Sequence, residues 1–199
     1  GTEAVILDLD GTVYRADDPI PGAPAAIERL RERGYDLLFC SNNPTKTPAQ
    51  YVEKLRGMGI ETTEGEVLSA ALVLHEYLNE YHRDDPTYLV GEDALATYLR
   101  DGGQELVSDP ERASVFVVSS DERFDYNTLQ AALRGIDEET TFLGSDPDRT
   151  APGEDGLIPG SGALINAVAG TVGREPDRIL GKPSTEAAQA ALGRLGVEP

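Results

Sequence analysis

Short apolar runs alternate with amphipathic stretches along the first 81 residues. Strand-length apolar runs are Ala4–Leu7, Tyr35–Cys40 and Glu66–Ser69. Helical spacing of apolar residues runs from Pro24 to about Arg33, from Pro48 to about Met58, and after Ser69 through about Tyr81. The first two helices begin at prolines and end at glycines, which suits helix termini. This βαβαβ order predicts an α/β fold with a parallel sheet and right-handed crossovers.

A second α/β unit interrupts the first. After a linker at Arg83–Pro86, the pattern predicts strands at Thr87–Val90, Ser114–Ser119 and Thr140–Leu143, and helices at Ala94–Arg100, Tyr126–Leu133 and Ala163–Ala169. The chain then returns through Pro176–Arg178 and Ile179–Pro183 to a helix at Thr185–Leu195. We therefore expect a Rossmann-like core made of residues 1–81 and 179–199, with residues 82–178 inserted as an α/β cap domain.

Two acids follow the first expected strand directly, in the run Asp8-Leu9-Asp10-Gly11-Thr12. Gly11 allows a sharp turn, so backbone N–H groups can face a ligand there. Two carboxylates and exposed amides at the end of a strand suit Mg²⁺ and a phosphoryl group, with one carboxylate as nucleophile and its neighbour handling the proton. The alternative to a functional site is an ordinary Asp/Gly turn after a strand.

The second expected strand also ends in polar residues, Ser41, Asn42 and Asn43. Because ligands of open parallel sheets bind at the carboxyl ends of the strands, these residues and the two acids predict a single site. Lysine is scarce, with only Lys46, Lys54 and Lys182 in the chain. We place Lys46 on the surface or the rim of the site, and Lys54 on an exposed helix face.

Composition narrows the class of protein further. The 199 residues include 39 % hydrophobic residues and carry a net charge of −19, which argues against nucleic acid as the main partner. No apolar run approaches the ~20 residues of a membrane span, so no membrane partner is expected. The single cysteine, Cys40, excludes an internal disulfide and suits the cytoplasm. The evenly spread acids resemble the surface of a halophilic protein, although an acidic protein from an ordinary organism is the alternative.

The motifs together resemble the haloacid dehalogenase superfamily of phosphatases. They are Asp-x-Asp-Gly-Thr, then Ser-Asn-Asn after the second strand, then Gly181-Lys182-Pro183 after an inserted domain. The resemblance is to the subclass with a large α/β cap, which includes 4-nitrophenyl, phosphoglycolate and NagD-type phosphatases, and it extends over nearly the whole chain. It implies a Mg²⁺-dependent hydrolase of a small phosphate monoester, such as a sugar phosphate, phosphoglycolate, a nucleotide or an aryl phosphate. A homodimer is one option for its assembly.

The resemblance also implies roles for individual residues. Asp8 would form an aspartyl-phosphate and Asp10 would act as general acid and base. Both would bind Mg²⁺, Asp10 through its backbone carbonyl. Lys182 would neutralise charge on the nucleophile and the phosphoryl group. The expected substrate-binding residues are Gly11, Thr12, Ser41, Asn42 and Asn43. The cap acids Asp146 and Asp148 would repel anionic leaving groups if they faced the site.

One feature departs from the family pattern. The family's fourth motif, a Gly-Asp pair plus a further acid that completes the Mg²⁺ site, does not occur in these 199 residues. We expect that the chain is incomplete relative to its gene product. The alternatives are a fragment completed by another chain, or a non-catalytic binding or regulatory protein. Phosphotransfer to an acceptor other than water is a further alternative to hydrolysis.

Overall fold

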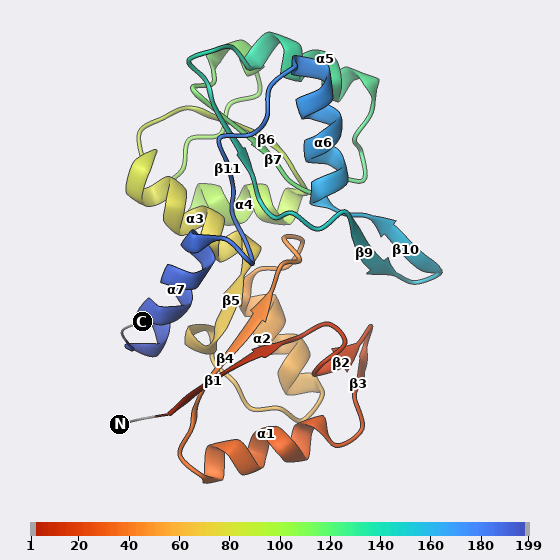
Figure 1. Cartoon of the computed structure of the whole chain (residues 1–199), viewed down its shortest axis with the longest axis vertical. Helices are drawn as coiled ribbons and strands as arrows, with labels where there is room; N and C mark the ends of the chain where they lie inside the picture. Colours follow the sequence, from red (N-terminus) through yellow and green to blue (C-terminus); the bar gives the residue numbers. More distant parts are fainter. Residues whose placement is uncertain (1–2, 198–199) are drawn as a thin grey trace.

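The structure, a computed structural model, describes residues 3–197 and contains two α/β units stacked end to end (Figure 1). The core sheet has the strand order β1-β4-β5, formed by Ala4–Asp8, Asp36–Ser41 and Val67–Ser69. The cap sheet has the order β11-β8-β7-β6, formed by Arg178–Ile179, Thr141–Gly144, Val115–Val118 and Thr87–Val90. Within each sheet, all pairs of strands are parallel. The predicted α/β class with a Rossmann-like core and an inserted cap is confirmed.

Helices begin where polar residues cap them. Thr47 and Gln50 form a reciprocal capping box at the start of α2, and Ser69 and Ser184 accept backbone N–H bonds at the starts of α3 and α7. The helices are α1 (Ala23–Glu32), α2 (Pro48–Gly57), α3 (Ala70–Tyr81), α4 (Asp93–Asp101), α5 (Tyr126–Gly135), α6 (Ser161–Val172) and α7 (Thr185–Leu195), with short 3₁₀ turns η1 (Glu64–Glu66) and η2 (Pro110–Arg112). Every predicted helix and strand is present, with ends within about three residues of those expected from the pattern.

Two antiparallel hairpins were not predicted. One pairs β2 (Tyr14–Arg15) with β3 (Asp18–Pro19), directly after the acidic turn. The other pairs β9 (Thr150–Gly153) with β10 (Gly156–Pro159) and projects from the cap beside the core (Figure 1). The first has strands of two residues, and the second is exposed and contains prolines, so neither leaves an alternating apolar pattern in the sequence.

The core and the cap share a hydrophobic cluster built around α3. Leu74 and Leu78 of α3 pack in one cluster with Leu68 of the core sheet and Val117 and Leu143 of the cap sheet. The strand β11 pairs with β8 at the edge of the cap sheet. The domain boundary predicted between residues 178 and 179 therefore falls inside a strand of the cap.

Register in the core sheet brings the strand ends together. Asp8 lies opposite Cys40, and Ser41 lies opposite Ser69, so the residues after β1 and β4 emerge at the same edge. At the other side of β1, Ile6 is 52 % exposed, because β1 is an edge strand of this sheet. Among residues 3–197, no helix is both long and apolar enough to cross a membrane.

Candidate active site

The acidic turn after β1 is held by its own backbone. Leu9 is fully buried, and its carbonyl oxygen accepts hydrogen bonds from the amides of Thr12 and Val13. Gly11 has φ +81°, a conformation that favours glycine, and its amide donates to the carbonyl of Tyr14 at 2.8 Å. The amides of Gly11 and Thr12 therefore both donate within the turn, and their contact with a ligand stays a prediction.

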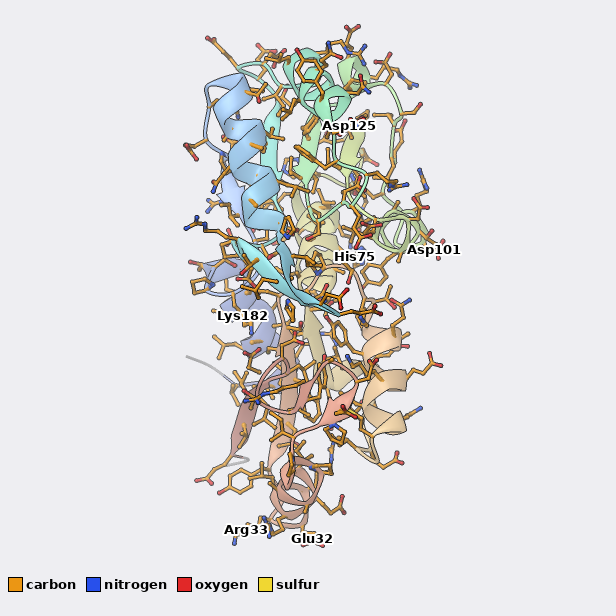
Figure 2. The ribbon with its side chains drawn as sticks, turned by 90° about the vertical axis from the view of Figure 1, so that its right-hand side faces the viewer. Glu32, Arg33, His75, Asp101, Asp125 and Lys182 are labelled. Carbon is orange, nitrogen blue, oxygen red and sulfur yellow. The ribbon has the colours of Figure 1, made fainter. Side chains whose placement is uncertain are left out.

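The ammonium group of Lys182 contacts the carboxylate of Asp8. The Lys182 ammonium nitrogen Nζ is 2.6 Å from Oδ1 of Asp8, although the two residues are 174 positions apart in the sequence. The amide of Leu9 donates to the same Oδ1 at 3.1 Å. Figure 2 places Lys182 between the core and the cap. The structure thus brings together the two residues that the sequence predicted as nucleophile and charge-neutralising lysine.

Asn42 contacts the loop that carries Lys182. Its Oδ1 accepts from the amide of Lys182 at 2.7 Å, and its Nδ2 donates to the carbonyl of Lys182 at 2.8 Å. Nδ2 is also 3.3 Å from Oδ1 of Asp148 in the cap. The carboxamide predicted to bind substrate is therefore engaged with the protein itself.

Ser41 and Asn43 stabilise the segment after β4. Ser41 is 3 % exposed, and its hydroxyl pairs with the Tyr51 hydroxyl at 3.0 Å and accepts from the Asn43 amide at 3.1 Å. The Asn43 side-chain oxygen accepts from the amide and the hydroxyl of Thr45. Ser41 is not among the residues that line the cleft described below, and its contact with substrate stays a prediction.

A cleft of about 980 Å³ separates the core from the cap. Asp8, Asp10, Asn42, Asn43 and Lys182 line its core side, whereas Gly11 and Thr12 do not. On its cap side the cleft is strongly acidic; the carboxylates there are Glu92, Asp93, Asp121, Glu122, Asp146 and Asp148. The hairpin β9–β10 and Phe124 add apolar surface to the same wall.

Comparison with known proteins identifies the family of this chain. Residues 5–105 match the haloacid dehalogenase-like hydrolase family. An acid sugar phosphatase of Staphylococcus epidermidis is 35 % identical over 196 residues, covering 98 % of this chain and 75 % of the relative. This chain belongs to the haloacid dehalogenase-like hydrolases. The family resemblance predicted from the motifs is confirmed, and so is the prediction of a phosphatase-type enzyme.

Solved structures of this hydrolase family agree with the fold over nearly the whole chain. A p-nitrophenyl phosphatase from Archaeoglobus fulgidus superposes with a TM-score of 0.92 at 34 % identity, covering 99 % of this chain and 75 % of that one. A 4-nitrophenylphosphatase from Thermotoga maritima has a TM-score of 0.90 at 28 % identity, covering the same shares.

The lysines near Asp10 lie closer to the site of this hydrolase than the sequence predicted. Lys54 was assigned to the exposed surface, but its side chain is 17 % exposed and its ammonium lies 4.0 Å from the centre of the Tyr14 ring. Burial raises the pKa of Asp10, while the positive charge of Lys54 opposes the rise. Lys46 lines the cleft, as its predicted place at the rim allows. Scarcity of lysine in the sequence drew attention to Lys46 and Lys182, and the same signal could have included Lys54.

Asp146 is a buried carboxylate on the cap wall. It is 2 % exposed, and burial raises its pKa to about 6, against the stabilising hydrogen bond that the Ser145 hydroxyl donates at 2.9 Å. The serine hydroxyls of Ser119 and Ser161 extend this polar cluster behind it. Sequence reasoning singled out Asp146 as a cap acid, and its burial became visible only in the fold.

The two acids after β1 suit a hard divalent cation. Within residues 3–197, no group of three or more His, Cys, Asp or Glu side chains is arranged to hold a metal ion. Mg²⁺ commonly binds through one or two carboxylates and completes its shell with water and substrate phosphate oxygens. Asp8 and Asp10 both line the cleft, and the Asp8 carboxylate with the backbone carbonyl oxygen of Asp10 fits that partial donor set, which leaves the Asp10 carboxyl group free to carry a proton.

Proposed function

We propose that this hydrolase cleaves the phosphate monoester of a small, uncharged sugar through a covalent intermediate on Asp8, with Mg²⁺ as cofactor. The observation that carries the proposal is the contact of 2.6 Å between Lys182 and Asp8 at the mouth of the cleft. Both hydrogen bonds to Asp8 go to Oδ1, from Lys182 and from Leu9. We therefore assign the attack to Oδ2.

In the first half of the reaction, Oδ2 of Asp8 attacks phosphorus and the bond from phosphorus to the leaving oxygen breaks. Asp10 donates its proton to that oxygen, so the leaving group departs as a neutral alcohol. The raised pKa of Asp10, which burial causes, favours the protonated form that this step needs. Lys182 neutralises the negative charge that collects on Asp8 and the phosphoryl group.

In the second half, the carboxylate of Asp10 removes a proton from water, and the water oxygen attacks phosphorus. The bond between phosphorus and Asp8 breaks, which releases inorganic phosphate and restores the nucleophile. Asp8 and Asp10 would hold Mg²⁺, which supplies positive charge to the phosphoryl oxygens when it is bound.

The charge of the cap wall supports an uncharged leaving group. Arg123 pairs with Asp93 and Asp121, at 2.9 and 3.0 Å. Of the six acids on this wall, the remaining four are Glu92, Glu122, Asp146 and Asp148. Their field opposes a carboxylate or a second phosphate on the leaving group. A sugar instead offers hydroxyl donors to these oxygens, and relatives named acid sugar phosphatases are consistent with that class.

Three kinetic comparisons test the proposal. Asp8→Asn should lower kcat on 4-nitrophenyl phosphate at least 1,000-fold (about 10³, as for loss of a nucleophile), whereas Asp101→Asn, an exposed acid at the end of α4, should match wild type. EDTA should abolish turnover and Mg²⁺ should restore it. The phosphate ester of an uncharged sugar should have a higher kcat/KM than phosphoglycolate, whose leaving group carries a carboxylate. Turnover of Asp8→Asn within tenfold of wild type would refute the assignment of the nucleophile.

A further inference from the structure

Asn42 joins three segments that are distant in the sequence. It follows the central core strand β4 and makes two hydrogen bonds to the backbone of Lys182, 140 residues later. Its amide nitrogen also faces Asp148 of the cap, 106 residues later. One half-buried side chain therefore contacts both the returning chain and the cap wall.

The pairing to Lys182 uses both ends of the carboxamide. Oδ1 accepts from the Lys182 amide, and Nδ2 donates to the carbonyl of the same residue. A carboxamide side chain offers an acceptor and donors together in one rigid plane. Asp148 accepts from the same Nδ2, which is consistent with this orientation of the amide. The Asn42 side chain thus satisfies both the N–H and the C=O of Lys182, as the backbone of a neighbouring strand would.

The loop before Lys182 is closely packed against the same side chain. Gly181 has φ +66°, and a Cβ built there would lie 3.1 Å from Oδ1 of Asn42 and 3.0 Å from Cβ of Asp146. Lys182 itself carries a long flexible stem that ends at Asp8. Because the stem is flexible, the place of its ammonium group depends on how firmly the backbone beneath it is held.

We propose that Asn42 is a positioning residue that holds the backbone of Lys182 so that its ammonium group stays on Asp8. This role rests on the proposed function for its effect on turnover, whereas its effect on the Lys182 loop stands without it. It differs from a substrate contact, because the carboxamide acts through Lys182 and not on the phosphoryl group.

Amide hydrogen exchange tests the structural part directly. The chain has three lysines, so labelling with ¹⁵N-lysine gives few backbone amide signals. The signal that disappears in Lys182→Arg is that of the Lys182 amide. Asn42→Ala should accelerate exchange of the Lys182 amide at least tenfold and leave the Lys54 amide, inside α2, unchanged. Asn127→Ala, an exposed asparagine of α5, is the matched control and should change neither. Unchanged exchange at Lys182 in Asn42→Ala would overturn the proposal.

Asn42→Asp provides a second variant of nearly the same size. Its carboxylate keeps an acceptor for the Lys182 amide, but it places oxygen where Nδ2 now donates to the Lys182 carbonyl and faces Asp148. We expect a loss of kcat at least as large as in Asn42→Ala, with far-UV circular dichroism unchanged. Wild-type kcat in Asn42→Asp would contradict a role for the donor half of the pairing.

A double-mutant cycle on 4-nitrophenyl phosphate tests the functional part. Asn42→Ala should lower kcat tenfold or more with KM within threefold of wild type. In a Lys182→Ala background the same change should lower kcat less than threefold, because its effect passes through Lys182. Equal losses in both backgrounds would overturn the proposal in favour of direct substrate contact. If Asp8→Asn matches wild type, the proposed function fails, and amide exchange still decides the role of Asn42 in the loop.

Discussion

Removing the charge of Lys182 should separate catalysis from stability. In Lys182→Met the stem keeps its approximate length and loses the ammonium that lies 2.6 Å from Asp8. The side chains are 37 % and 54 % exposed, so this is a solvent-screened ion pair. Pairs of that kind contribute about 0–1 kcal/mol to folding. We therefore expect the free energy of unfolding to fall by less than ~1 kcal/mol.

The same change should have a much larger effect on turnover. The phosphoryl group of the proposed substrate brings further negative charge to a cleft already lined by acids, and Lys182 is in contact with Asp8, the proposed nucleophile. Loss of one preorganised electrostatic group from an active site typically costs about 2.7–4 kcal/mol in the transition state, or roughly 10²–10³ in kcat. The expected ratio of kcat between wild type and Lys182→Met is therefore on the order of 10²–10³.

Urea unfolding and hydrolysis of 4-nitrophenyl phosphate, measured in the same buffer, give both numbers. Lys46→Met is the charge-matched control, because Lys46 lines the same cleft from its rim. Its kcat should fall less than tenfold. The reasoning is refuted if Lys182→Met keeps more than a tenth of wild-type kcat, or if its unfolding free energy falls by more than ~2 kcal/mol, beyond what a screened pair contributes.

Three further predictions concern the fold. Leu74→Ala should lower the free energy of unfolding in urea by about 2–5 kcal/mol, because Leu74 is fully buried in the shared cluster. Burial raises the pKa of the Cys40 thiol to about 11, so at pH 8 a thiol reagent should label it rapidly only in denaturant. Burial raises the pKa of Glu66, but hydrogen bonds from Arg31 and Thr62 outweigh it and leave the pKa lowered. Glu66→Gln should therefore reduce Tm at pH 7, and the difference should vanish as acid protonates Glu66 below its lowered pKa.

Local pattern was sufficient to predict the helices and the central strands of both parallel sheets in this chain. The buried strand Val115–Val118 and the amphipathic helix Thr185–Leu195 follow from runs and spacings that are contained in a few neighbouring residues. The hairpin Thr150–Pro159 could not be found that way, because its stability comes from pairing and from its place beside the cleft. Its residues Leu157 and Ile158 are exposed, which breaks the alternation that marks a half-buried strand.

The sequence predicted which residues form the site, but not which of them contact one another. Motif spacing marked Asp8, Ser41, Asn42 and Lys182, but a linear pattern does not say which polar atoms satisfy one another. Ser41 pairs with Tyr51 and Asn42 pairs with the Lys182 backbone, across 10 and 140 residues. Buried polar groups take whichever partner the fold brings within reach, and sequence alone gives no such distance.

The residues of the proposed reaction and the acids that would face the leaving group lie on opposite walls of the cleft. Asp8 and Asp10 emerge from the core strand β1, whereas Glu92, Glu122 and Asp148 line the opposite wall from the cap. Because the attack, the proton transfer and the charge of Lys182 all belong to the core side, the proposed chemistry does not need the cap acids. Replacing Glu122, which is exposed, by glutamine should therefore shift kcat/KM towards anionic leaving groups while 4-nitrophenyl phosphate turnover stays close to wild type. That result would support the proposal that the charge of the cap wall, and not the residues that carry out the reaction, sets which phosphate ester is cleaved fastest.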